Sequence, residues 1–220
     1  MYNTRTLLIQ FKNELADWEV PLFRGAVIQA LDDDDVLFHN HEGDKARYFY
    51  PLIQYKAIGG KAAIMCINEG IDSVAKLFEA GHMTFAIGKR IVNMEVEHND
   101  VQRGNVELTA EPIRYAIANW LALNKDNYQK YMEAGSLEER ISILESVLRG
   151  NILSMCKTLD VDIKENIICS LNTLSGPKVK KFKSIKMLCF DAEFNANIWL
   201  PDYIGLGKNA STNHGTVVKL

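Results

Sequence analysis

The chain has 220 residues, of which 47% are hydrophobic and 24% charged, and its formal net charge is -3. These values are ordinary for a globular protein, and they argue against both disorder and nucleic-acid binding through an overall basic charge. No stretch approaches the roughly 18 consecutive apolar residues of a membrane span, and the N-terminal apolar run is too short for a signal peptide. The four cysteines are widely spaced among apolar neighbours, as reduced core thiols are, so we expect a cytoplasmic protein.

The first half of the sequence begins with a strand pattern at residues 5–12 and a helix pattern from residue 21. Pro21 lies in the first turn of this predicted helix, and its end runs into four aspartates, Asp32 to Asp35. Like charges at the negative end of a helix dipole are unfavourable for stability. The aspartate run therefore has no obvious structural purpose.

The sequence from residue 48 to residue 98 continues with strands and one short helix. Residues 48–70 read as two strands joined by a tight turn at Gly59-Gly60. Asp72 or Ser73 can cap the start of the helix, and Gly81 can close its end. Residues 82–98 give one more strand or a strand pair. The order β-α-β-β-α-β predicts a ferredoxin-like fold.

The second half repeats part of this pattern. A strand is predicted at 105–119, and Ser136 with Glu139 forms a capping box ahead of a long amphipathic helix. Strand-like runs at 166–174, 178–200 and 215–220 follow, divided by Ser175-Gly176-Pro177 and by a glycine-bearing loop. With a polar break at 99–106, we predict an α+β protein of tandem ferredoxin-like, RAMP-like domains, 1–103 and 104–220.

Charge is distributed unevenly along the chain. Residues 176–220 contain seven lysines and only three acidic residues, so this segment is basic while the rest is acidic. Such a segment can present a basic face to phosphates. The alternative is a solvated, lysine-rich hairpin without a ligand.

The triplet His39-Asn40-His41 has three interpretations. In an extended segment the two imidazoles point to the same side, so with an aspartate, His82 or His98 they could ligate a metal ion. They could instead serve as an acid–base pair, because an imidazole titrates near neutral pH. The third interpretation is a polar turn, and the triplet by itself does not decide among the three.

The glycine-bearing loop begins at Gly205. Its Gly205-x-Gly207-x-x-Ala210 spacing matches the letters of a dinucleotide fingerprint, but the ten residues after Ala210 leave no room for the required helix and strand. Lys208, Ser211 and His214 could instead contact a phosphate backbone together with backbone N–H groups. An ordinary turn between strands is the alternative.

Several stretches in order resemble one protein family. They are Phe23-Arg24-Gly25, VLFHNH at 36–41, YPLIQYK at 50–56, INEG at 67–70, WLALN at 120–124, GNILSMCK at 150–157, PDYIGLGK at 201–208 and GTV at 215–217. Together they resemble the CRISPR-associated repeat-processing endoribonucleases of the RAMP superfamily, in the branch found with type I-B systems. The resemblance covers most of the chain and implies tandem ferredoxin-like domains.

The resemblance also implies a reaction and its partners. It implies cleavage of CRISPR repeat RNA without metal or cofactor, in which a ribose 2′-hydroxyl attacks the adjacent phosphate and leaves a cyclic phosphate. His39 and His41 match the family's histidines and are expected to act as base and acid, and Tyr50 is expected to orient or stabilise the phosphate. The expected RNA contacts are Lys178, Lys180, Lys181, Lys183, Lys208, Ser211 and His214. Other CRISPR effector subunits or a second copy of the chain are possible partners.

Two departures from the family pattern leave a rival function open. The aspartates Asp32 to Asp35 stand where members often have a lysine, and Thr212-Asn213-His214-Gly215 replaces an arginine followed by Gly-aromatic-Gly. Carboxylates beside a scissile phosphate repel it. The alternative function is therefore an RNA-binding structural subunit without catalysis, and a metal-dependent hydrolase using His39, His41 and an aspartate is the third.

Overall fold

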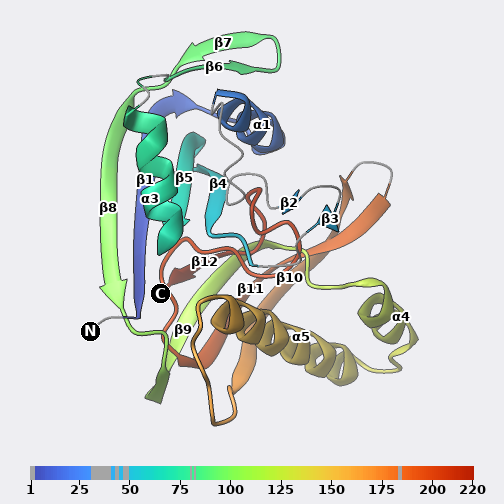
Figure 1. Ribbon diagram of the computed structural model, residues 1–220. Helices are drawn as coiled ribbons and strands as arrows, with labels where there is room; N and C mark the ends of the chain where they lie inside the picture. The colour runs from blue at the N-terminus through green and yellow to red at the C-terminus, as the bar shows by residue number, and fades with distance from the viewer. Residues whose placement is uncertain are drawn as a thin grey trace. The chain divides into compact units, whose positions relative to one another are not determined.

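The computed structural model describes residues 3–30, 41–42, 45–46, 50–79, 81, 83–182 and 185–220, with the backbone alone for 41–42, 45–46 and 181–182 (Figure 1). The chain divides into two compact units. The first consists of Met1–Gly104 with Ser211–Asn213, and the second of Asn105–Ala210 with His214–Leu220. The expected division into 1–103 and 104–220 differs in assigning the whole C-terminal loop to the second domain.

The first unit is built on a four-stranded antiparallel sheet in the order β4-β5-β1-β8, which is the ferredoxin-like order. Its elements are β1 (Thr4–Glu14), η1 (Asp17–Glu19), α1 (Val20–Ala30), β2 (His41–Glu42), β3 (Lys45–Ala46), β4 (Ile53–Ile58), β5 (Lys61–Ile67), α3 (Glu69–Glu79), β6 (Thr84–Ile87), β7 (Arg90–Asn93) and β8 (Val96–Gly104). Helix α3 packs against β5, and α1 lies beside β4 and β6 (Figure 1). β4 and β8 are the sheet's edge strands.

The core of the first unit lies between the sheet and its two helices. Phe23 of α1 makes edge-to-face contacts with Phe11 of β1, Tyr55 of β4 and Phe85 of β6, with ring centroids 5.7–6.2 Å apart. Val74 and Leu77 of α3 join the same cluster of buried side chains. The turn between β4 and β5 is the predicted Gly59-Gly60, and both residues have positive φ.

The second unit repeats the strand order, as β10-β11-β9-β12. Its elements are β9 (Leu108–Trp120), α4 (Lys125–Glu133), α5 (Leu137–Thr158), β10 (Cys169–Phe182), β11 (Ile185–Ile198) and β12 (Thr216–Lys219). The predicted cap of α5 is present, since Ser136 Oγ accepts a hydrogen bond from the Glu139 N–H at 3.1 Å. Residues 199–215 form a loop where the second helix of a ferredoxin-like repeat would be. The predicted fold class, tandem ferredoxin-like domains, is confirmed.

Three local predictions were wrong. Helix α3 begins at Glu69, so Asp72 and Ser73 do not cap it; Gly70 lets its first turn approach Leu52, because a Cβ there would lie 2.5 Å from the Leu52 carbonyl oxygen. Residues 99–104 are part of β8, an edge strand that pairs with β1 and tolerates polar residues because it is exposed. β10 continues through Ser175-Gly176-Pro177 with a shift in register, which an edge strand allows because a proline there interrupts no central ladder.

The four cysteines are free and buried. Among the helices in the described part of the chain, none is both long and apolar enough to cross a membrane.

Candidate functional site

The predicted catalytic residues belong to the first unit. His39 and Asp32 to Asp35 lie outside the described residues. His41 begins β2, where its backbone pairs with Ala46, and its side chain is not described. Tyr50 stands three residues before β4, and its side chain is buried, with 8% exposed.

The C-terminal loop continues the sheet of the first unit beyond β4. The Tyr55 N–H donates to the Ser211 carbonyl oxygen at 2.9 Å, and the Asn213 N–H donates to the Tyr55 carbonyl oxygen at 3.0 Å. These bonds form a parallel bridge between Tyr55 and Thr212. Asn213 Nδ2 also donates to Asp17 Oδ1 at 3.0 Å. Ser211–Asn213 is therefore fixed on the edge strand that begins just after Tyr50.

Two glycines shape this loop at its base. Gly215 has φ +62°, and a Cβ on it would lie 1.8 Å from the Leu206 carbonyl oxygen. The Leu206 N–H donates to the Gly215 carbonyl oxygen at 2.8 Å, so the two ends of the loop are held together. Gly207 has φ +87° and lies against Trp120, whose Nε1 donates to Asn151 Oδ1 at 3.0 Å. Only glycine fits either position without strain.

A polar network in the second unit connects this loop to the basic hairpin β10–β11. Asn119 of β9 has a left-handed backbone, with φ +55°, at a shift in register with β11. Its carbonyl oxygen accepts the Gly215 N–H at 3.1 Å, and its side-chain oxygen accepts Lys180 Nζ at 2.7 Å. Asp191 accepts the Asn119 N–H with Oδ1 and Lys178 Nζ with Oδ2. Burial would raise the pKa of Asp191, but these two bonds hold it below its usual value.

The predicted RNA-binding residues differ in how free their charges are. Lys178 is exposed but forms an ion pair with Asp191 at 2.6 Å. Lys180 is half-buried, and its Nζ donates a hydrogen bond to Asn119 Oδ1. Lys208 is exposed, and among the described residues it forms no ion pair. Ser211 and His214 are half-buried. The side chain of Lys181 is not described, and Lys183 lies outside the described residues.

A buried lysine lies on β4. Lys56 is fully buried, and burial lowers its pKa from 10.5 to about 7. Strand alternation puts Lys56 and the buried Gln54 on the face opposite Tyr55. Burial also raises the pKa of Tyr55, opposed in part by the nearby Arg24 guanidinium. Neither residue was singled out by sequence reasoning.

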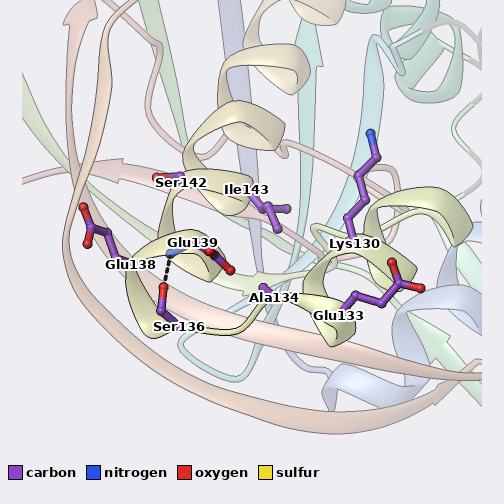
Figure 2. A pocket seen from close by; sticks show the side chains of 8 residues that line it. All are labelled: Lys130, Glu133, Ala134, Ser136, Glu138, Glu139, Ser142 and Ile143. Atoms are coloured by element: carbon purple, nitrogen blue, oxygen red, sulfur yellow. Dashed lines mark hydrogen bonds between the residues drawn. The ribbon is translucent and has the colours of Figure 1, made fainter.

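A shallow depression of about 670 Å³ lies where α4 meets α5 (Figure 2). The residues that line it are Lys130, Glu133, Ala134, Ser136, Glu138, Glu139, Ser142 and Ile143. Three glutamates against one lysine repel phosphate, so this depression is not the anion site. It contains none of the predicted site residues.

Within the described part of the chain, no group of three or more His, Cys, Asp or Glu side chains could hold a metal ion. The residues of the metal hypothesis, His39, the His41 side chain and Asp32 to Asp35, fall outside that search. The finding therefore does not decide between the metal and acid–base interpretations.

Sequence reasoning missed the residues that hold the loop in place. An asparagine tolerates positive φ better than most residues, but nothing near Asn119 marks it within a strand pattern. Asp191 reads as one more polar residue in a long strand, and its pairing with Lys178 depends on register. The bridge between Tyr55 and Thr212 joins residues far apart in the chain, so no local pattern predicts it.

Comparison with known proteins covers both halves of the chain. The N-terminal domain of the Cas6b family matches residues 2–105, and its C-terminal domain matches residues 107–220. A crystal structure of Cas6b has 28% sequence identity and a TM-score of 0.85, covering 99% of this chain and 100% of that chain. A structure described as the CRISPR RNA processing endoribonuclease Cas6b has 28% identity and a TM-score of 0.75, with 99% of each chain covered. An uncharacterised protein of Methanocaldococcus jannaschii is 36% identical over 104 residues, which are 47% of this chain and 69% of that relative.

Proposed function

The chain belongs to the Cas6b family of CRISPR-associated endoribonucleases, and we propose that it cleaves CRISPR repeat RNA by attack of a ribose 2′-hydroxyl on the adjacent phosphate. The observation that carries this proposal is the match of both Cas6b domains, together covering almost the whole chain. The products would be a 2′,3′-cyclic phosphate and a 5′-hydroxyl, and no metal ion takes part.

The reaction needs one group to remove the proton of the 2′-hydroxyl and another to protonate the leaving 5′-oxygen. We assign these roles to His39 and His41, because imidazole carries out both transfers near neutral pH. Tyr50 has a supporting role. Its buried side chain suits orienting a neighbour at the site rather than gripping the RNA directly.

The RNA is held by the basic hairpin and the C-terminal loop. Lys208 provides an exposed charge on the loop, and Lys178 and Lys180 provide cations on β10. The carbonyl oxygen of Ser211 accepts a hydrogen bond from Tyr55 of β4, the strand that follows Tyr50. We therefore propose that the RNA backbone contacts the loop at Ser211.

One assay separates this reaction from its rivals. The protein is incubated in EDTA with repeat RNA and, in parallel, with the same RNA carrying a single 2′-deoxy nucleotide at the cleavage position. We expect cleavage of the first RNA only. Binding without cleavage would indicate a structural RNA-binding subunit, a function that the comparisons do not favour. Activity abolished by EDTA would indicate a metal-dependent hydrolase.

The resemblance supports two further proposals about the setting of this activity. The enzyme acts in the cytoplasm, and it associates with other CRISPR effector subunits or with a second copy of itself. Sedimentation of the purified chain with and without repeat RNA tests for association with a second copy, since a homodimer would double the mass.

A further inference from the structure

Trp18 is a large aromatic residue that the structure leaves in solvent. It lies in the middle of η1 (Asp17–Glu19), and 72% of its surface is exposed. Tryptophan is on average among the more buried residues, because removing its large ring from water stabilises the folded chain. An isolated exposed apolar residue needs no explanation by itself. What distinguishes Trp18 is how firmly its turn is held.

The turn is fixed on both sides of the tryptophan. On one side Asp17 Oδ1 accepts Asn213 Nδ2 at 3.0 Å. On the other side Glu19 Oε1 accepts Arg90 Nη2 at 2.5 Å, while its Oε2 accepts the Ala16 N–H at 3.0 Å. The carboxylate of Glu19 is largely buried. The backbone that carries Trp18 is therefore pre-organised, and a ligand that meets the indole does not have to order it.

The surroundings of Trp18 suit a nucleotide better than a protein. Glu19 is paired with the Arg90 guanidinium, whereas Asp17 accepts an amide hydrogen bond and keeps its negative charge, which the uncharged face of a base tolerates better than a phosphate does. Among the described residues linked to this turn by sequence or through the Arg90–Glu19 pair, the other exposed large apolar side chains are Leu22, at 41%, and Ile91, at 81%. A stable protein interface buries about 800 Å² on each partner around several apolar anchors, which is more than one indole, one leucine and one isoleucine provide.

The loop that is proposed to contact the RNA is bonded to this turn. Asn213, which bonds to Asp17, ends the Ser211–Asn213 segment that pairs with Tyr55. In the proposed function this segment lies along the RNA backbone, so an unpaired base leaving that backbone comes within reach of the residue next to Asp17. Arg90 has a half-exposed side chain on the other side of the turn.

We propose that Trp18 is a stacking platform for one unpaired base of the repeat RNA, next to the backbone that follows Ser211–Asn213. This inference rests on the proposed function, because it takes the RNA as the ligand. Stacking of a base on an aromatic ring is tolerant of sequence and involves no counterion release. Trp18 therefore contributes to affinity and to the position of the strand, and not to the salt dependence of binding.

The test measures binding of repeat RNA with a 2′-deoxy nucleotide at the cleavage position, so that no cleavage interferes. We expect Trp18→Ala to raise Kd about five- to 150-fold, with an unchanged slope of log Kd against log salt concentration and an unchanged Tm. Trp18→Phe keeps a ring and should recover most of the affinity. Val101→Ala is the matched control, because Val101 is a 56% exposed apolar residue of the same unit on β8, at the sheet edge opposite β4.

Fluorescence supplies an independent readout. RNA should quench the emission of the wild-type protein, and Trp18→Phe should remove most of this quenching, although Trp120 and Trp199 remain. A Kd for Trp18→Ala within twofold of wild type would overturn the inference, as would a loss of affinity that Val101→Ala shares. A change of oligomeric state in Trp18→Ala would overturn it in favour of a protein interface. If the wild-type chain neither binds nor cleaves repeat RNA, the proposed function itself has failed.

Discussion

The carboxylate of Asp191 accepts the backbone N–H of Asn119 at 2.7 Å, and by doing so fixes a left-handed residue near the end of β9. Asn119 in turn accepts the Gly215 N–H, so Asp191 of β11 supports the base of the C-terminal loop. The same carboxylate holds Lys178 of the basic hairpin. One side chain thus positions two parts of the expected RNA surface.

We expect Asp191→Ala to lower the free energy of unfolding by about 1–3 kcal/mol, because it leaves the partly buried Asn119 N–H without its acceptor. Asp191→Asn keeps an acceptor for this N–H, so its free energy of unfolding should fall by less. The matched control is Glu193→Ala on the same strand. It removes an ion pair with Arg114, and this should lower the free energy of unfolding by less than about 1 kcal/mol. Urea titration measures all three, and equal losses for Asp191→Ala and Glu193→Ala would contradict the positioning role.

Gly215 should not tolerate any side chain. Its φ is +62°, and a Cβ at this position would lie 1.8 Å from the Leu206 carbonyl oxygen, so Gly215→Ala must displace the loop. We expect a loss of RNA binding and a clear fall in Tm. Gly150→Ala is the control, since Gly150 lies in α5 with nothing within 4 Å, and alanine there should stabilise by about 0.5–1 kcal/mol. Circular dichroism melting and RNA binding compare the two variants.

Lys56 should make stability depend on pH. Its pKa is about 7 in the folded chain and near its ordinary 10.5 when unfolded. Between these values the unfolded state binds more protons, so the contribution of Lys56 to stability rises with pH from about 7 to about 10.5. Below pH 7 the lysine is protonated in both states, and the full cost of burying its charge remains.

The variant Lys56→Met removes this cost. It should be more stable than wild type at pH 7, by on the order of a few kcal/mol at most, and the advantage should shrink as pH rises toward 10. Urea titrations of both proteins at pH 6.5, 8 and 9.5 measure the difference. A constant difference across this range would show that Lys56 is not a buried lysine of lowered pKa.

The lysines of the basic segment should not contribute equally to RNA binding. Lys208 forms no ion pair among the described residues, whereas Lys178 has to leave Asp191 before it can meet a phosphate. We therefore expect Lys208→Ala to raise Kd more than Lys178→Ala does. Lys208→Ala should also lower the slope of log Kd against log salt concentration by about 1.

The control for this comparison is Lys125→Ala, which removes an exposed lysine from α4, away from the basic hairpin and the loop in the sequence. It should change neither Kd nor the slope. A larger effect for Lys178 than for Lys208 would mean that the pair with Asp191 does not restrain Lys178.

The fold followed from the sequence where local signals were strong. The Gly59-Gly60 turn between two strands and the Ser136 cap are short-range features, and the turn agrees with the pairing of β4 and β5 in the first unit. The start of α3 did not follow, because it depends on how closely Gly70 approaches Leu52, which no local pattern encodes.

The candidate site was less predictable than the fold. The lysines could be read from charge alone, but that Lys178 is neutralised by Asp191 depends on the register of β10 and β11. The attachment of Ser211–Asn213 to Tyr55 joins segments about 150 residues apart, and only the folded sheet brings them together. His39 and His41 were chosen from a resemblance, and their roles stay a prediction.

The most direct test of the central claim is the variant His39→Ala/His41→Ala, assayed for repeat-RNA binding and for single-turnover cleavage in the same preparation. If the two imidazoles move the protons of the ribose–phosphate linkage, cleavage should fall by at least about a thousandfold while Kd stays within about threefold of wild type. Cleavage near the wild-type rate would contradict the claim, and so would a loss of cleavage that is matched by an equal loss of binding.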